Sequence, residues 1–246
     1  MLEHGEFAGY IGCCIDITDQ KDVKVAQAEL SGRLIQAQET ERARIARDLH
    51  DDINQRLALL ANGLQELKAV AARYGSEGRG QLDDLWHLTN EISTDIQHMS
   101  HQLHPSKLHY LGLAAAVRDL CQGFSKSHNV EVECVVRDLP ADLEEGASLS
   151  LFRVVQESLH NIAKHSGARH AKVEFVRRSA SILLRVSDDG VGFDSNHRHN
   201  DQGLGLVSME ERLKLIGGRL TVWSRPSLGT QVEATIPAVE SQVHIA

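Results

Sequence analysis

The sequence predicts an α+β fold, in which a helical hairpin is followed by an α/β two-layer sandwich. Between about residues 20 and 103, apolar side chains recur at steps of three and four, the period of helices that bury one face. Beyond about residue 112, strand-like segments alternate with helix-like ones, which is typical of a sheet covered by helices. The 246 residues suffice for two compact units and a helical connector.

The composition narrows the functional classes. No apolar run approaches the roughly 20 residues that a membrane-spanning helix needs, so we expect a cytoplasmic chain without a membrane segment. The formal net charge of -8 argues against direct nucleic-acid binding, which relies on basic patches. The cysteines have no CxxC spacing, and we expect reduced thiols, with redox sensing by the adjacent Cys13 and Cys14 as the alternative.

Residues 1 to about 20 are expected to form strand and turn, a piece too short to bury a core by itself. The end of this piece, Asp16-Ile17-Thr18-Asp19 followed by Lys21, resembles the exit of a PAS sensor domain. The rest of such a domain is missing, so the resemblance implies a fragment of a longer sensor. A helical linker would then occupy residues 21–38.

The helical region contains two apolar stripes. The first lies within a helix predicted from Gln20 to about Arg73 and consists of Ile45, Leu49, Ile53, Leu57, Leu60, Leu64 and Leu67. After a Gly-rich turn at residues 74–80, the second consists of Leu82, Leu85, Ile92, Ile96, Met99 and Leu103, and Pro105 stops it. Two antiparallel helices leave much of these stripes uncovered, which predicts a homodimer built on a four-helix bundle.

The second unit is predicted to contain five strands and three helices. The strands are expected at residues 130–136, 171–176, 182–186, 218–223 and 230–236. Helices are expected at residues 113–127, 148–164 and 207–216, and residues after Pro237 are expected to be loose. This alternation predicts the two-layer sandwich.

His50 is the first candidate for chemistry. It follows Leu49 on a helix and therefore lies at the edge of the apolar stripe, within reach of another domain. An imidazole near neutrality is both a nucleophile and a proton acceptor. Asp51 can orient it and take its proton, and Gln55, four residues after Asp51, can hold a water for the reverse hydrolysis. The alternative is a solvated charged helix face with an incidental histidine.

A pocket for a nucleotide is indicated further along the chain. An apolar strand runs into Asp188-Asp189-Gly190-Val191-Gly192, where glycines allow the backbone to approach a ligand. Asp188 can accept a hydrogen bond from an exocyclic amine such as that of adenine, although a tight turn alone would also explain the motif. Gly203-Leu204-Gly205-Leu206 then opens a helix whose free N–H groups suit phosphates.

A predicted helix over residues 153–165 completes this pocket. Its polar residues three to four positions apart are Glu157, Asn161, Lys164 and His165. An amide oxygen and a carboxylate suit Mg²⁺, while Lys164 and His165 suit phosphate oxygens. Because the chain has no P-loop motif, this is a different type of nucleotide site. A histidine and a nucleotide pocket in one chain predict phosphoryl transfer between them.

These motifs together resemble those of a two-component sensor histidine kinase. The surroundings of His50 resemble the H-box, residues 157–165 the N-box, residues 188–192 the G1 box and residues 203–206 the G2 box. Two later stretches, Gly217-Gly218-Arg219-Leu220 and Gly229-Thr230, are similar to the closing strands of the gyrase–chaperone–kinase ATPase fold.

The subfamily is indicated by the sequence motif Glu-Arg-x-x-Ile-Ala-Arg-Asp-Leu-His-Asp at residues 41–51, together with Gln55. This motif and the segment at residues 103–113 resemble those of nitrate-sensor-like kinases, which serve LuxR-type response regulators. The resemblance spans roughly residues 40–237.

The resemblance implies a role for each matching residue. His50 would be the phospho-acceptor, Asp51 the base and Gln55 the phosphatase residue. Asp188 would read adenine, and Asn161 would hold Mg²⁺ together with Glu157. The other residues expected to bind ATP are Lys164, His165, Gly190, Gly192, Gly203, Gly205, Leu206 and Thr230.

The resemblance also implies an organisation and partners. Residues 39–110 would form the dimerisation and phosphotransfer helices, residues 111–238 the ATP-binding domain, and residues 239–246 a flexible tail. The partners would be a second copy of the chain and a response regulator with receiver and DNA-binding domains. His160 and Ser227 depart from the family pattern, and residues 195–202 would be the ATP lid.

Two other functions fit part of the sequence. A serine kinase of the same fold, acting on an anti-sigma antagonist, would explain the pocket but leave His50 without a role. A dimeric signalling scaffold could bind nucleotide without transfer, although the intact Asn161, Asp188 and glycines argue against it.

Overall fold

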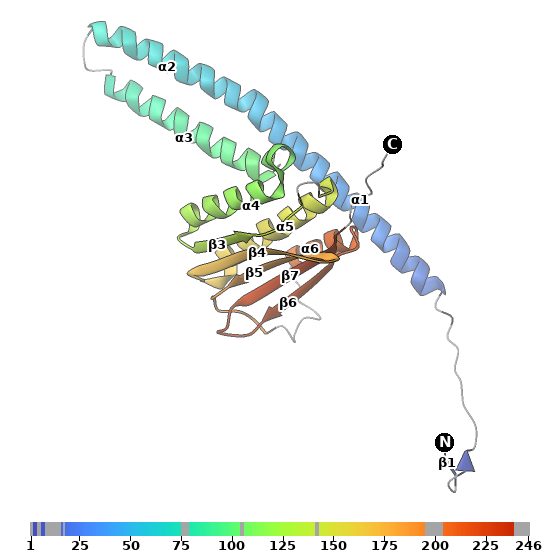
Figure 1. Cartoon of the computed structure of the whole chain (residues 1–246). Helices are drawn as coiled ribbons and strands as arrows, with labels where there is room; N and C mark the ends of the chain where they lie inside the picture. Colours follow the sequence, from blue (N-terminus) through green and yellow to red (C-terminus); the bar gives the residue numbers. More distant parts are fainter. Residues whose placement is uncertain are drawn as a thin grey trace, which may run out of the picture.

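Residues 18–74 form one continuous helical rod, and the next helix runs back along its second half (Figure 1). The structure is a computed structural model that describes residues 2–3, 6–7, 16, 18–74, 79–103, 106–140, 143–194 and 204–238. Helix α1 (Thr18–Asp48) continues through a π-helical turn, η1 (Leu49–Ile53), into α2 (Asn54–Tyr74). Helix α3 (Arg79–Leu103) runs back along α2, so the predicted helical hairpin is confirmed.

The rod begins two residues earlier than the apolar pattern predicts. The Asp16 carboxylate accepts a hydrogen bond of 2.9 Å from the backbone N–H of Thr18, the first residue of α1. A side-chain acceptor at this place satisfies one of the free N–H groups of a helix start. Before it, β1 (Leu2–Glu3) and β2 (Glu6–Phe7) pair antiparallel.

The apolar stripes of the hairpin are only partly covered within one chain. Leu64 is 9% exposed, whereas Leu60 and Leu67 are more than half exposed at 52% and 57%. On α3, Leu85, Ile92 and Met99 are also exposed. The hairpin therefore exposes an apolar surface made of side chains from both helices. No other described residue of the chain covers this surface.

Three helices of the second unit lie between the rod and the sheet (Figure 1). Helix α4 (Ser106–His128) contains a break at Gly112, whose φ of 77° is left-handed, so a short helical piece precedes the predicted start at Leu113. Helix α5 (Glu145–Asn161) continues into a π-helical turn, η2 (Ile162–Ser166). Helix α6 spans Leu204–Lys214.

The sheet contains all five predicted strands. They are β3 (Glu131–Val136), β4 (His170–Arg178), β5 (Ser181–Asp188), β6 (Arg219–Ser224) and β7 (Thr230–Pro237). Their order is β3-β4-β5-β7-β6, with β3 and β4 parallel and the other neighbours antiparallel.

The core lies between this sheet and helices α4, α5 and α6. Its largest fully buried side chains include Phe175, Leu151, Leu159, Ile182, Leu184 and Leu213. Alternate residues of the strands point into the core. Residues on the opposite face form ion pairs, such as Arg185 with Glu174 and Glu233. The predicted α+β class with a two-layer sandwich is confirmed.

Several sequence predictions lie outside the described residues. These are Cys13, Cys14, Pro105, Gly203, the lid at residues 195–202 and the tail at residues 239–246. Cys121 is buried and Cys134 half-buried, and both are free thiols, as predicted. A hydrogen bond with Cys134 and burial raise the pKa of Cys121. Among the described helices, none is both long and apolar enough to cross a bilayer.

Candidate functional site

A cavity of about 410 Å³ opens between α5, α6 and one end of the sheet. Its volume lies within the range of ordinary small-ligand pockets. The lining residues are Ser158, Asn161, Ile162, His165, Ser166, Val186, Asp188, Gly192, Phe193, Gly205, Leu206, Val222, Thr230 and Val232. The structure thus brings together predicted site residues from four separate segments of the chain.

The floor of the cavity is apolar. Val232 is paired with Val186 on one side and with Val222 on the other, so the three valines form one row across β5, β7 and β6. Each is less than 10% exposed. Such a row offers a flat apolar surface to an aromatic ring.

Asp188 stands at the end of β5, opposite Thr230 of β7. Its carboxylate accepts a hydrogen bond of 2.9 Å from the backbone N–H of Gly190. Partial burial raises the pKa of Asp188, against the effect of hydrogen bonds from Gly190 and Thr230. An oxygen of Asp188 at the wall of an apolar pocket can accept a hydrogen bond from an exocyclic amine.

Two glycines hold the loop after Asp188 against the β6–β7 turn. Gly192 has a φ of 60°, and a Cβ there would lie 2.1 Å from the carbonyl oxygen of Arg225. Gly229 has a φ of 73°, and a Cβ there would lie 1.9 Å from the carbonyl oxygen of Asp188. No side chain fits at either position, because the backbone segments touch. Gly190 is buried behind the cavity wall, against Ser166.

Asp189 joins two strands beside this loop. Its Oδ1 accepts hydrogen bonds from the backbone N–H groups of Arg169 and His170, at 2.9 and 3.0 Å. Its Oδ2 lies 2.7 Å from Nδ1 of His170. These interactions, led by those with His170, lower the pKa of Asp189 to about 2. Asp189 therefore fixes the start of β4 to the end of β5.

Asn161 and His165 lie in the cavity wall, whereas Lys164 is exposed and does not line the cavity. The π-helical turn after Asn161 explains the difference, because it winds less per residue than an α-helix and turns Lys164 away. Glu157 is half-buried beside the start of α6, where a Cβ on Gly205 would lie 2.0 Å from its Oε1. Gly205 thus leaves room for this carboxylate.

An amide oxygen and a carboxylate fit Mg²⁺, which takes few protein ligands and keeps waters and phosphate oxygens. Asn161 faces the cavity, whereas Glu157 lines a neighbouring cavity between the long helices and the sandwich and reaches the first cavity only beside Gly205. Within the described residues, no group of three or more His, Cys, Asp and Glu side chains forms a self-contained metal site. A cation here would therefore depend on a bound phosphate chain for its other ligands.

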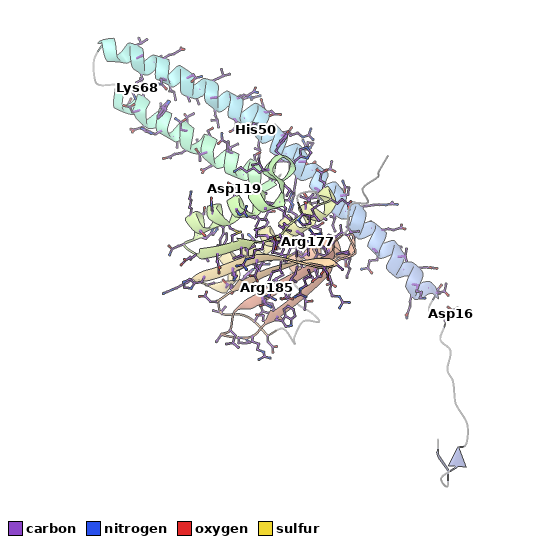
Figure 2. All side chains as sticks on the ribbon, in the orientation of Figure 1. Asp16, His50, Lys68, Asp119, Arg177 and Arg185 are labelled. Carbon is purple, nitrogen blue, oxygen red and sulfur yellow. The ribbon has the colours of Figure 1, made fainter. Side chains whose placement is uncertain are left out.

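His50 lies within η1, where α1 joins α2, outside the sandwich (Figure 2). Its side chain is 66% exposed, and its Nδ1 lies 3.1 Å from Oδ1 of Asp51, which is 72% exposed. Gln55 is exposed on the first turn of α2. The π-helical turn is closed by a hydrogen bond from the backbone N–H of Asn54 to the carbonyl oxygen of Leu49.

A second cavity, of about 700 Å³, lies between the rod and the sandwich. Leu49, Met99 and Leu103 contribute from the helical unit, and residues of α4, α5 and α6 contribute from the other side. This cavity shares no lining residue with the first one. His160, which departs from the family pattern, lines this second cavity.

No motif marks several residues of the first cavity. They are Ser158, Ile162, Ser166, Val186, Phe193, Val222 and Val232. The valines could have been found from the sequence, because they occupy apolar positions of predicted strands, and one of these strands runs into the Gly-rich turn after Asp188. The other residues depend on how α5 and the loop after β5 pack.

Comparisons with known proteins match both units of the chain. Residues 41–108 match the family model for histidine kinases, and residues 146–240 match that for histidine kinase-, DNA gyrase B- and HSP90-like ATPases.

Two curated proteins are similar along most of the chain. The sensor histidine kinase MctS of Rhizobium johnstonii is 33% identical over 217 residues, covering 85% of this chain and 45% of that protein. The oxygen sensor histidine kinase NreB of Staphylococcus carnosus is 30% identical over 224 residues, covering 90% of this chain and 63% of that protein. The chain therefore spans less than two thirds of the length of either relative.

Solved structures with a similar arrangement include the histidine kinase domain of a blue-light activated histidine kinase from Erythrobacter litoralis. Its TM-score is 0.49 at 16% sequence identity, and the match covers 74% of this chain and 94% of that one.

Proposed function

The chain belongs to the sensor histidine kinases of two-component systems, and from this we propose that it transfers the γ-phosphoryl group of ATP to His50 and then to an aspartate of a response regulator. The observation that carries this proposal is the pairing of two features in one chain. One is an exposed histidine held by a carboxylate, and the other is a pocket with Asp188 and Asn161 in its walls.

His50 is suited to act as the nucleophile. If its Nδ1–H donates to Asp51, the lone pair of Nε2 is free to attack the γ-phosphorus. A bond from Nε2 to phosphorus then forms, the bond from phosphorus to the bridging oxygen breaks, and ADP leaves with the electron pair. The ring becomes cationic, and Asp51 accepts the proton from Nδ1.

The pocket is suited to ATP. The adenine ring would lie on the valine floor with its exocyclic amine donating to Asp188. The phosphates would lie at the start of α6, near His165, where free N–H groups favour anions. Bound Mg²⁺ would neutralise phosphate charge, and Asn161 with Glu157 would hold it there.

Gln55 is proposed to support dephosphorylation of the regulator, in which water attacks the aspartyl phosphate and releases inorganic phosphate. A π-helical turn is a one-residue insertion into an α-helix. The fifth residue after His50 therefore takes the angular position that a fourth residue would have in a regular α-helix, beside His50. From there the Gln55 amide can hold a water in line with the phosphorus.

A homodimer is the proposed assembly. The uncovered apolar stripes of α2 and α3 would pair with those of a second copy to form a four-helix bundle. We assign residues 39–110 to this dimerisation unit and residues 111–238 to the ATP-binding unit. The sequence motif around His50 supports a regulator of the LuxR type, with receiver and DNA-binding domains, as the phosphoryl acceptor.

The test is autophosphorylation with labelled ATP and Mg²⁺. We expect the wild-type protein to take up label and His50→Gln to take up none. His87→Gln, which changes an exposed histidine on α3, is the matched control and should label normally. Undiminished labelling of His50→Gln would contradict the assignment, and label on a serine would favour the serine-kinase alternative.

A further inference from the structure

Three charged side chains outside the site are buried where α1 meets the sandwich. Glu39 of α1 is 9% exposed, Arg153 of α5 is 4% exposed and Arg212 of α6 is 5% exposed. Charged side chains are almost never this buried unless they are paired. We call these three residues the Glu39 cluster.

Glu39 holds both arginines at once. Nη2 of Arg153 donates to Oε2 of Glu39 at 2.6 Å, and Nη1 of Arg212 lies 2.9 Å from Oε1. Nη2 of Arg153 also donates to the carbonyl oxygen of Leu103, at the end of α3, at 2.7 Å. The Glu39 cluster therefore joins α1, α3, α5 and α6 at one point.

A second contact aligns α1 with α6, which lie side by side in Figure 1. A Cβ on Gly32 of α1 would lie 3.1 Å from Cδ2 of Leu215, just after α6. Gly32 precedes Glu39 by about two helical turns, and Arg212 precedes Leu215 by about one. The two contacts therefore lie on one face of α1 and join about two turns of it to the last turn of α6.

This contact connects the rod to the nucleotide pocket. The first turn of α6 contributes Gly205 and Leu206 to the pocket wall, while its last turn is held by Glu39. About three turns beyond Glu39, the rod presents His50. In this arrangement no residue of α1, η1 or α2 lines the nucleotide pocket, so His50 and the pocket of one chain are kept apart.

We propose that the Glu39 cluster is an autoinhibitory contact, which holds the ATP-binding unit on α1 with its pocket away from His50. A rotation or shift of α1 breaks the contact and frees the unit to reach a histidine. This inference rests on the proposed kinase function and adds the means by which α1 controls it.

The chemistry of the cluster suits a switch. A buried ion pair gains little net stability, because the loss of hydration offsets most of the attraction. When the two units separate, Glu39 and both arginines regain water, so opening is not opposed by a buried unpaired charge. A modest movement of α1 can therefore shift the balance between the two arrangements.

The first experiment compares Glu39→Gln with Glu29→Gln, which changes an exposed glutamate on the same helix. Glutamine keeps the shape of Glu39 but removes the charge that both arginines require. We expect Glu39→Gln to raise the initial rate of His50 labelling by about tenfold, ~1.4 kcal/mol, and Glu29→Gln to leave it unchanged. An unchanged or lower rate in Glu39→Gln would overturn the proposal.

The second experiment traps the contact in the double variant Gly32→Cys with Leu215→Cys. A Cβ on Gly32 would lie 3.1 Å from Cδ2 of Leu215, so two cysteines at these positions are neighbours in the contact and can be linked by oxidation. We expect the oxidised, intramolecularly linked protein to label His50 at about a tenth of the reduced rate, ~1.4 kcal/mol, with full recovery on reduction. Equal rates in the two forms would overturn the inhibitory role.

The yield of this cross-link requires no kinase activity and therefore separates the two hypotheses. Adding Glu39→Gln should lower the yield, because the rod and the sandwich then separate more often. Equal yields with and without Glu39→Gln would overturn the role of Glu39 even if His50 labels normally. Absent labelling of the reduced wild-type protein would contradict the proposed function, while the yields would still decide whether Glu39 holds the contact.

Discussion

Replacing Asp188 with asparagine should separate nucleotide affinity from the stability of the fold. Asp188 is the carboxylate at the wall of the apolar cavity, at the end of β5. An asparagine can keep the hydrogen bond from the backbone N–H of Gly190 with its oxygen. Its amide nitrogen, a donor, would then face the exocyclic amine of adenine, which is also a donor.

The expected magnitudes follow from this geometry. A hydrogen bond to a charged group is worth about 1.5–3 kcal/mol, so Asp188→Asn should weaken ATP binding by about 10- to 100-fold. Burial raises the pKa of Asp188, so the ionised carboxylate opposes folding at any pH above that raised value. Removing the charge relieves this cost, which should offset the hydrogen bond from Thr230 that an asparagine gives up, so the nucleotide-free protein should be no less stable than wild type.

Titration calorimetry with ATP measures the first effect, and urea unfolding without nucleotide measures the second. Asp84→Asn, which changes an exposed carboxylate on α3, is the matched control and should alter neither quantity. Unchanged ATP affinity in Asp188→Asn would refute the role of Asp188 in reading adenine. A lower unfolding free energy would refute the argument from burial.

Three further predictions concern other parts of the molecule. Ser227 has a left-handed φ of 65°, which costs a non-glycine residue about 1–2 kcal/mol; Ser227→Gly should stabilise the protein by about 0.5 kcal/mol net of glycine entropy, and a lower urea midpoint would contradict this. The pKa of Asp189 is lowered to about 2, so its stabilising effect is complete above the ordinary value near 3.8 and is lost as pH falls through about 2. The difference in unfolding free energy between wild type and Asp189→Asn should therefore shrink over this range, and a constant difference would count against the assignment. Gln55→Ala should keep autophosphorylation but lose dephosphorylation of the regulator, and equal loss of both would exclude a separate role for Gln55.

The strands and the long helices could be predicted from local patterns. In β4 and β7 the buried positions alternate, as expected for a sheet with one covered face. The steps of three and four along α2 and α3 similarly predicted the hairpin. These features depend on neighbours in the sequence, which is why the sequence alone was sufficient.

The π-helical turns could not be predicted, because no local residue type marks them. The turn after Asn161 changes the phase of the helix, so His165 enters the pocket and Lys164 does not. A regular α-helix would have kept all the polar residues of this segment closer to one face.

The burial of Arg153 could not be predicted either. In the sequence Arg153 is a polar residue in an amphipathic helix, and such residues normally face solvent. Its partner Glu39 lies on another helix, 114 residues away along the chain. Contacts at such a separation depend on how the two units pack, and the Glu39 cluster became visible only in the structure.

The most direct test of the central claim is to map the phosphoryl group after incubation with ATP and Mg²⁺. Peptide mass spectrometry under neutral or alkaline conditions preserves phosphohistidine and locates it. We predict modification of His50 and of no other exposed histidine, including His109 and His170. A phosphoryl group on another residue, with His50 unmodified, would contradict the account.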